Sequence, residues 1–563
     1  MIVNARAATR LSVTLFVTTV AVTGLVACGG GDKSSSSPPP AGGGDGQAKQ
    51  GGPGAGSQSP RYGGTLVVAL PGDPSPLNPA ITPSGITHPV TGQIFDGLVR
   101  LYGTDFHPEP DLARSWDISK DGRTYTFHLQ HGVRWHDGKP FSSADVKYTY
   151  ESILLKLGAR TRQLKPVIRR IETPDEDTVV FRLAYRYPPF LKWLDEDNGA
   201  ILPKHIFQGT DPLKNPANAK PVGTGPFMFG SAIKGNRITL MRNPHYFEKG
   251  RPYLDRIDFR IIPPPQAVQA FRAGEIGLMV FPTPPDLKVL KSVDGVTVTQ
   301  SGKQGFARVI RMIPNLRRKP FGDVRVRRAI ASAIDRPFIA KAAYGGTFTP
   351  ATGPISHDFK PWYSSDVMKF PHDPAKARAL LDQAGLKPGK DGVRLRTSLI
   401  FDAAFAPTAA LLKQELGQVG IALKLQLLDF NGWVTKLYIQ KDFDLGYSQI
   451  TDPADPDIGS RGLYTCNNIA PVPFSNGSNY CNPKVDKLYA RAAREPDMSK
   501  RVALYAQIQR ILVRDQPQFF LVDAIGPWAW SGKYAGFDQA GAKSPYYFGR
   551  TAFSTSGTAT PAG

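Results

Sequence analysis

The second half of the chain alternates strand-like and helix-like segments, and this alternation constrains the fold more than any other feature. Asp373, Pro374 and Gly385 mark one helix completely, with Asp at the N-cap, Pro at the first helical position and Gly after the last turn. Asp323 is the predicted N-cap of another helix. The other predicted helices cover residues 405–419 and 498–512, and the predicted strands cover residues 394–400, 422–428 and 443–448. Strands that alternate with long helices imply an α/β lobe.

The first half is richer in strand patterns. Residues 64–70 form an apolar run that ends in Pro-Gly, which is typical of a buried strand. Residues 125–129 alternate apolar and polar side chains, which indicates a half-buried strand. A turn at Gly132 and a second strand at residues 133–135 would complete a hairpin, and Ser142 is expected to cap the helix that follows.

The length of the chain requires more than one lobe. The sequence has 563 residues, whereas a single hydrophobic core stops growing at about 250–300 residues. Hydrophobic residues make up 41% of the chain and aromatic residues 10%, which is enough apolar material for real cores. We therefore expect at least two lobes.

The N-terminus has the pattern of an export signal. Arg6 and Arg10 precede an apolar stretch at residues 11–26, which is short for a membrane span. It ends in Leu25-Val26-Ala27-Cys28, which resembles the lipobox of bacterial lipoproteins, where Cys28 would be lipidated. The alternatives are a signal peptide with an incidental cysteine, or a short anchor. Residues 29–60 are rich in Gly, Ser and Pro and predict a flexible tether.

The chain is basic, with 69 Lys and Arg against 47 Asp and Glu and a net charge of +22. Such an excess fits nucleic acid, an anionic membrane or an acidic ligand. The charges are scattered in short runs, and no basic block reaches the length of a nucleic-acid arm, so a basic solvated surface is favoured. The metalloprotease, nucleophile-elbow and phosphate-loop signatures are missing from the sequence, and nothing singles out a catalytic pair.

Several segments together resemble the family 5 extracellular solute-binding proteins, which are the oligopeptide-, dipeptide- and nickel-binding lipoproteins of ABC importers. The segment Val222-Gly-Thr-Gly-Pro-Phe227 is one of the matches, and they keep the family order over nearly all of residues 62–550. The matching segments are residues 112–116, 121–129, 132–141, 144–146, 222–227, 242–246, 252–257, 320–329, 333–336, 442–445, 455–456 and 482–488.

The resemblance implies an α/β fold of the bilobed periplasmic-binding-protein type (type II, peptide-binding branch), with an extra subdomain in the first lobe. A ligand that contacts both lobes would shift the protein from an open to a closed form. The implied divisions are a lipoprotein signal peptide (1–27), a lipid-anchored linker (28–60), lobe I (61–96, 206–300 and 520–550), an inserted subdomain (97–205), lobe II (301–519) and a disordered tail (551–563).

The resemblance also implies a function without covalent chemistry: the capture of short peptides and their delivery to the permease and ATPase complex of an ABC importer. We expect an exported, lipid-anchored monomer with no cofactor, no metal and no nucleic-acid partner. Alternative solutes are a nickel or metallophore chelate, an oligosaccharide or an opine. A different alternative is a surface lipoprotein that uses the fold for sensing or adhesion.

The candidate ligand site follows the predicted strand at residues 443–448, because α/β sheets bind ligands at the carboxyl ends of their strands. Gly446, Tyr447 and Ser448 lie on this strand, and Asp452 follows it. In peptide-binding relatives an aromatic residue after a glycine is followed by an Asp that holds the peptide's α-ammonium group, and Tyr447 and Asp452 are the matching positions. Here the spacing is longer, and the aromatic residue is usually Trp. The alternative is that Asp452 makes a turn, which is the favoured interpretation of Asp455 and Asp457.

Three further motifs have competing interpretations. Residues 223–226 are either part of a ligand cleft or a tight structural turn, and the turn is the favoured interpretation. Cys466 and Cys481 are expected to form a disulfide in an exported protein, although free thiols or a metal pair are alternatives. His128, His131 and His136 have a spacing that suggests a metal at first sight, but we expect surface positions in a hairpin.

Substitution of Asp452 by Asn is expected to weaken peptide binding while the fold stays intact. The reason is that a carboxylate that becomes buried when the lobes close needs a cation. A ligand without an amine would leave this carboxylate unpaired, at a cost of several kcal/mol. Titration calorimetry measures the change, and an unchanged affinity would remove Asp452 from the site.

Overall fold

The computed structural model describes residues 59–559 apart from residues 83, 104, 300–306, 452, 453 and 538–543. The expected lipid-anchor residue Cys28, the signal peptide and the site residue Asp452 therefore lie outside the described residues. Within the described ranges, no helix is both long enough and apolar enough to cross a membrane.

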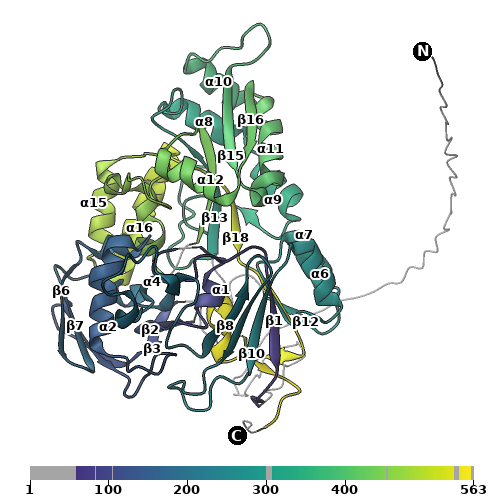
Figure 1. The fold of residues 1–563 in the computed structure, drawn as a ribbon. Helices are drawn as coiled ribbons and strands as arrows, with labels where there is room; N and C mark the ends of the chain where they lie inside the picture. Colours follow the sequence, from purple (N-terminus) through teal and green to yellow (C-terminus); the bar gives the residue numbers. More distant parts are fainter. Residues whose placement is uncertain are drawn as a thin grey trace, which may run out of the picture. The chain divides into compact units, whose positions relative to one another are not determined.

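The strands of the described part form two large sheets, one four-stranded sheet and two strand pairs (Figure 1). The first sheet has the strand order β12-β19-β11-β1-β10-β9-β8, and β1 runs parallel to both β10 and β11. Its strands are β1 (Thr65–Leu70), β8 (Phe227–Ile233), β9 (Arg237–Arg242), β10 (Arg256–Ile261), β11 (Leu278–Val280), β12 (Val296–Val298) and β19 (Trp528–Ser531). The strand predicted at residues 64–70 is confirmed as β1, a buried strand inside this sheet.

The second sheet has the strand order β14-β18-β13-β17-β15-β16. Strand β13 pairs antiparallel with both β17 and β18, and β15 pairs parallel with β16 and β17. The strands are β13 (Ala307–Pro314), β14 (Thr349–Pro350), β15 (Leu395–Phe401), β16 (Ile421–Leu427), β17 (Leu445–Thr451) and β18 (Phe519–Ile525). The strands predicted at residues 394–400, 422–428 and 443–448 are confirmed as β15, β16 and β17.

The predicted helices of the second half are also present. The Asp323 side chain accepts a hydrogen bond from the Arg325 amide at the start of α8, and the Asp373 side chain accepts one from the Lys376 amide at the start of α10. Gly385 follows α10 with a φ of 82°, which a residue with a side chain adopts at a cost. The main helices of this half are α8 (Val324–Ala333), α9 (Arg336–Tyr344), α10 (Pro374–Gln383), α11 (Ala406–Gly417), α15 (Pro483–Ala492) and α16 (Met498–Asp515).

Shorter elements complete the described fold. The short helices are α1 (His88–Thr91), α3 (Leu155–Leu157), α4 (Glu196–Gly199), α5 (Lys204–Phe207), α6 (Pro264–Arg272), α7 (Pro284–Leu290), α12 (Phe430–Val434), α13 (Pro456–Gly459), α14 (Arg461–Tyr464) and α17 (Ser544–Tyr547). Two strand pairs stand apart from the larger sheets: β2 (Val99–Tyr102) with β3 (His107–Pro110), and β20 (Tyr534–Ala535) with β21 (Phe553–Ser554).

The four-stranded sheet lies within residues 113–183 and has the order β4-β5-β7-β6. Its strands are β4 (Ala113–Ile118), β5 (Thr124–Leu129), β6 (Ile168–Asp175) and β7 (Thr178–Leu183), and helix α2 (Ser143–Tyr148) follows in the same region. Tyr125, Phe127 and Leu129 are buried on one face of β5, as the alternation predicts. The Asp145 side chain accepts a hydrogen bond from the Ser142 amide, so the predicted cap of this helix is confirmed as a capping box.

The predicted second strand of the hairpin, at residues 133–135, is wrong. The Trp135 amide bonds to the Lys139 carbonyl and the Phe141 amide bonds to the Val133 carbonyl, which closes a compact turn. Because β4 and β7 already pair with both edges of β5, neither edge is left for a strand from this segment.

Among the described strands, the chain passes between the two large sheets twice. The first passage lies between β12 and β13, and the second lies between Ile525 of β18 and Trp528 of β19. Since β18 pairs with β13 along most of its length, the second passage comes later than the expected boundary at residue 519. Strand β21 pairs with β20, and Thr558 bridges Tyr62, so the described part of the expected disordered tail forms ordered contacts. The other expected boundaries stay predictions.

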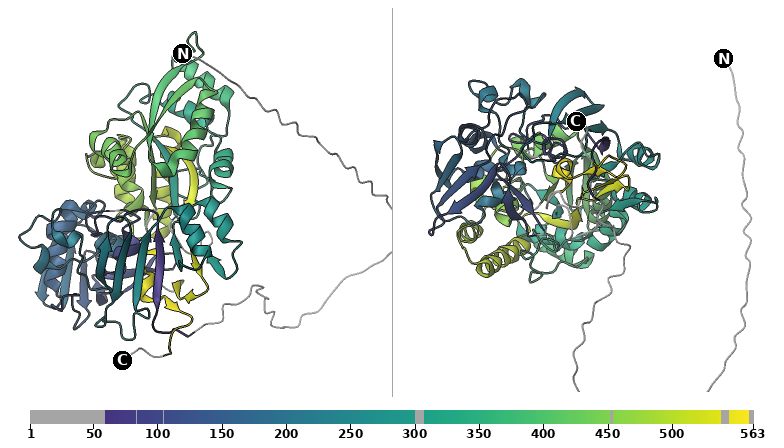
Figure 2. Two further views of the ribbon diagram at one scale, coloured as in Figure 1. Left: turned by 45° about the vertical axis from the view of Figure 1, so that its right-hand side comes forward. Right: turned by 90° about the horizontal axis from the view of Figure 1, so that it is seen from below.

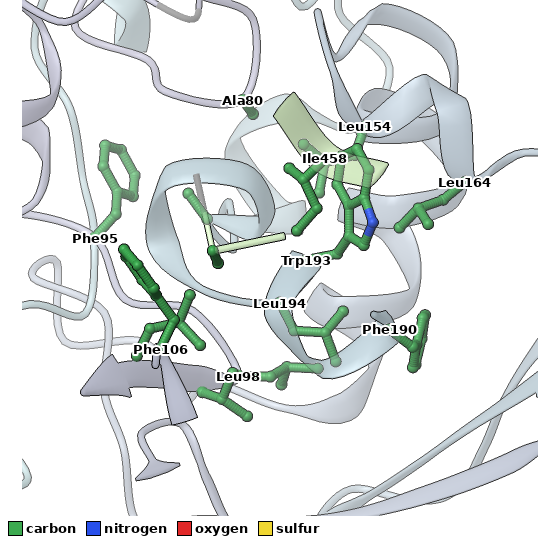
Figure 3. Close-up of a cluster of buried hydrophobic side chains, with 14 of the residues drawn as sticks. Ala80, Phe95, Leu98, Phe106, Leu154, Leu164, Phe190, Trp193, Leu194 and Ile458 are labelled. Atoms are coloured by element: carbon green, nitrogen blue, oxygen red, sulfur yellow. The ribbon is translucent and has the colours of Figure 1, made fainter. Parts of the chain in front are cut away.

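Two hydrophobic cores match the two large sheets. One contains β13, β15 and β17 together with α8, α9 and α11. The other joins the first sheet, the four-stranded sheet and the helices α13 to α16. In Figure 3, Ile458 of α13 and Leu164 lie on the two sides of the Trp193 ring. The left view of Figure 2 shows the green strands of the second sheet above the purple and dark teal strands of the first sheet.

A buried polar cluster fixes the C-terminal segment against the first half of the chain. Arg550 donates to Asp96 at 2.9 Å and to Asp111 at 3.0 Å, and Glu248 lies 3.5 Å from Arg550 and 2.6 Å from Arg100. Arg251 also contacts Glu248, at 3.1 Å, so three carboxyl groups face three guanidinium groups. Burial raises the pKa of Asp96 to about 7 and raises the pKa of Asp111 well above its usual value. Burial therefore favours the protonated form of these carboxyl groups.

We expect the free energy of unfolding to fall as the pH rises from about 4 to about 7, because the folded state keeps a carboxyl proton that the unfolded chain releases near pH 4. Asp96→Asn removes part of this proton uptake, so its stability should decline less between pH 5 and pH 8 than that of the wild type. Urea unfolding at the two pH values measures the difference. Asp366→Asn, at an exposed position, is the control, and an unchanged pH dependence in Asp96→Asn would contradict the assignment.

Candidate binding site

Strand β17 places the candidate residues in the middle of the second sheet. Tyr447 lies opposite Met312 of β13 and Ser448 lies opposite Arg311, so the two side chains point to opposite faces of the sheet. A Cβ atom at Gly446 would lie 2.4 Å from the Leu437 side chain, which explains the glycine by close packing.

The Tyr447 side chain is buried and well ordered by its neighbours. Its ring stacks on Phe405 with 4.1 Å between the ring centroids, and Trp433 lies 5.4 Å away. Its hydroxyl donates a hydrogen bond to Asp402 Oδ1 at 2.9 Å, and Gln449 Nε2 approaches the same hydroxyl at 3.5 Å. These contacts hold the Tyr447 side chain in one position, with its hydroxyl directed at the Asp402 carboxylate.

Asp402 directly follows β15, at the carboxyl end of a strand that runs parallel to β17. Its side chain is half-buried and also accepts a hydrogen bond from the Ala404 amide at 3.0 Å. Burial raises the pKa of Asp402, and no Lys, Arg or His of the described ranges forms an ion pair with it. The sequence analysis missed this residue, although an Asp directly after a predicted parallel strand is a signal that could have identified it.

Arg308 lies on the same face of the second sheet as Tyr447. It pairs with Thr451 across the β13–β17 ladder, four residues before Met312, which is the partner of Tyr447. Burial lowers the pKa of the Arg308 guanidinium, and the hydroxyls of Tyr344, Tyr447 and Tyr546 are its electrostatic neighbours. The sequence analysis did not single out this residue.

Ser448 takes part in a different environment. Its side chain is buried on the opposite face from Tyr447 and accepts a hydrogen bond from the Tyr438 hydroxyl at 3.3 Å. The structure therefore brings Tyr447 together with Asp402 and Arg308, and it separates Ser448 from them.

The other aspartates of the loop after β17 have structural partners. Asp455 caps α13 and forms two hydrogen bonds of 2.9 Å with Arg501, and both side chains are buried. Asp457 accepts hydrogen bonds from the Tyr187 hydroxyl and from Arg461. The bond from the Asp457 amide to Asp455 Oδ1 agrees with the interpretation of Asp455 as a turn residue, whereas the contacts with Arg501, Tyr187 and Arg461 were not predicted.

The remaining motifs are also structural. A Cβ at Gly223 would lie 1.8 Å from the Ile94 carbonyl oxygen, and the Gly225 amide donates to the same oxygen at 2.8 Å, so the glycine loop is a tight contact between segments. Cys466 and Cys481 form a disulfide, as expected.

One of the three histidines, His136, does not lie at the expected surface position. His128 and His131 bond to Asp117 and Asp177 near the surface. His136, by contrast, packs against the glycine loop, where it contacts the Gly223 amide and the Gly225 carbonyl. Burial lowers the pKa of His136 to about 4, so it is neutral at pH 7. In the described ranges, no group of three His, Cys, Asp or Glu side chains has a geometry suited to a metal ion.

Comparison with known proteins places these residues in a family context. The model of the bacterial extracellular solute-binding proteins, family 5 Middle, matches residues 107–471. A curated relative is di/tripeptide-binding protein 2 of Pseudomonas aeruginosa, which is 29% identical over 80% of this chain and 88% of its own length.

Two solved structures are similar over nearly their whole length. DppA of Helicobacter pylori, solved with the peptide STSA, has a TM-score of 0.78 at 28% identity and covers 88% of this chain and 99% of its own. AppA of Bacillus subtilis, solved with a nonapeptide, has a TM-score of 0.80 at 26% identity with the same coverage.

We expect Tyr447→Phe to lower the free energy of unfolding by about 1–2 kcal/mol at pH 8, because the ionised Asp402 loses a hydrogen-bond donor. The loss should shrink as the pH falls through the pKa of Asp402, since the protonated carboxyl depends less on that donor. Urea unfolding at pH 8 and pH 4 measures both effects.

Tyr438→Phe is the matched control, because its hydroxyl bonds to the neutral Ser448. Its effect should not depend on pH. An equal loss at both pH values in Tyr447→Phe would contradict the bond to an ionised Asp402.

Proposed function

The chain belongs to family 5 of the bacterial extracellular solute-binding proteins, and we propose that it captures short peptides outside the cytoplasm and delivers them to the permease of an ABC importer. The observation that carries the proposal is its similarity, over almost their entire length, to two proteins solved with bound peptides. The relative from Pseudomonas aeruginosa, named as a di/tripeptide-binding protein, supports the same solute class.

The edge of β17 supports a peptide as the ligand. Its pairing with β15 ends at Gly446, whereas its pairing with β13 continues to Thr451. In the described residues no strand covers the other edge of residues 447–451, so an extended peptide can pair there through backbone hydrogen bonds. This edge lies beside the Tyr447 and Asp402 side chains.

We propose that an opposite charge recognises the α-ammonium group of the peptide, and that Asp452 provides this charge. Gly446, Tyr447 and Ser448 form the strand that borders the ligand. Binding between the two lobes would favour a closed form that the permease recognises, and no covalent step is needed.

The N-terminal segment provides the proposed attachment. Lipidation of Cys28 would hold the protein at a bacterial membrane, and the linker at residues 28–60 would allow the binding domain to turn. A tethered binding protein remains close to its permease, which raises the local concentration of the loaded form.

Native mass spectrometry of the exported protein, purified gently from cells, tests the proposal. We expect a ladder of bound masses in the range of short peptides, which acid denaturation removes. A single sharp adduct would favour one non-peptide solute, and a protein mass with no adduct after incubation with a peptide mixture would contradict peptide capture.

A further inference from the structure

We propose that Arg308 holds a carboxylate of the bound ligand, and that it makes a free C-terminal carboxylate a requirement for tight binding. The inference rests on the proposed function, because it assumes a peptide ligand at this end of the second sheet. It adds the identity of the cationic partner, for which the sequence offers too many candidates.

The first argument is charge. A guanidinium group stays protonated in proteins, and a buried cation without an anion is costly. The Nε atom of Arg308 is buried and has no hydrogen-bond partner, and in the described ranges no Asp or Glu forms an ion pair with this side chain. A ligand carboxylate would supply both the missing charge and the missing acceptor.

Arginines that are buried more deeply than the half-buried Arg308 show how this chain satisfies such groups. Arg311 has no carboxylate and leaves its Nη2 atom without a partner, but it donates to the Val309 carbonyl group and to the Tyr464 hydroxyl. Arg501 has the carboxylate of Asp455, and Arg550 has those of Asp96 and Asp111. Arg336 has no carboxylate but donates to several backbone carbonyl groups. Arg308 has neither kind of partner among the described residues, which sets it apart from these structural arginines.

The second argument is position. Arg308 is the second residue of β13 and shares a face with Tyr447, whose hydroxyl contacts Asp402. The Asp402 carboxylate and the Arg308 guanidinium are thus both electrostatic neighbours of the Tyr447 hydroxyl. Opposite charges near one aromatic residue complement a ligand that carries both an ammonium and a carboxylate group.

The third argument is the convergence of two parts of the chain. Tyr344 belongs to α9 beside the second sheet, whereas Tyr546 belongs to α17, which follows the passage back to the first sheet, and both are electrostatic neighbours of Arg308. A ligand carboxylate at Arg308 would therefore lie where both parts of the fold can contact it. Such a contact can couple ligand binding to the relative arrangement of the two parts.

Peptide binding by the full-length exported protein in mild detergent tests the assignment. The probes are a mixture of random di- to hexapeptides and the same mixture with amidated C-termini, and native mass spectrometry measures bound peptide. We expect the wild type to prefer the free acids by about tenfold or more, and Arg308→Gln to reduce that preference to about threefold or less. Arg308→Lys keeps the charge and should retain part of the preference.

Arg396→Gln is the matched control, since it removes one positive charge from an exposed position on β15 of the same sheet. It should bind both mixtures as the wild type does. Circular dichroism and urea unfolding establish that each variant folds.

Each other outcome is decisive. Equal binding of both mixtures by the wild type, or an equal loss for both mixtures in Arg308→Gln, would overturn the assignment and leave the proposed function in place. Failure of both Arg308 variants to fold would also overturn it, because Arg308 would then serve the stability of the sheet. Failure of the wild type to bind either mixture would contradict the proposed function itself.

Discussion

The pairing of β13 with β17 and β18 is the interaction on which the candidate site depends. It joins the segment that enters the second sheet to the strand that carries Tyr447 and to the strand from which the chain leaves the sheet. The register places Arg308 and Met312 on the face of Tyr447, and Arg311 on the opposite face with Ser448. A shift of one residue would exchange these faces and bury the wrong set of side chains.

The buried and half-buried charged groups of this protein are of two kinds, paired and unpaired. Asp455 with Arg501, and Asp96 with Arg550, are compensated within the chain, and they join segments that are distant in sequence. Asp402 and Arg308 have no opposite charge as a partner in the described ranges, and both flank Tyr447. Internal pairs of this kind stabilise one arrangement of the chain, whereas unmatched charges favour a ligand that completes them.

Local patterns in the sequence predicted most of the second half of the fold. Caps at Asp323 and Asp373 and the apolar runs of β15 to β17 depend on neighbours within a few residues, so the sequence expresses them directly. The second strand of the expected hairpin failed because its possible partner, β5, is paired on both edges by strands that come from elsewhere in the chain. His136 was misplaced for a similar reason, since its partners in the glycine loop are distant in sequence.

The sequence by itself determined the α/β class, the family resemblance, the disulfide pair and the strand that carries the candidate site. These features rest on periodicity, on short motifs and on residue types, which need no knowledge of distant contacts. Only the tertiary structure decided which charged residues are satisfied. Asp455 and Asp402 both follow predicted strands, yet Arg501 neutralises only Asp455. Whether a charged residue is available to a ligand depends on contacts between segments that are distant in sequence. Only strand pairing and side-chain packing in the folded protein establish these contacts.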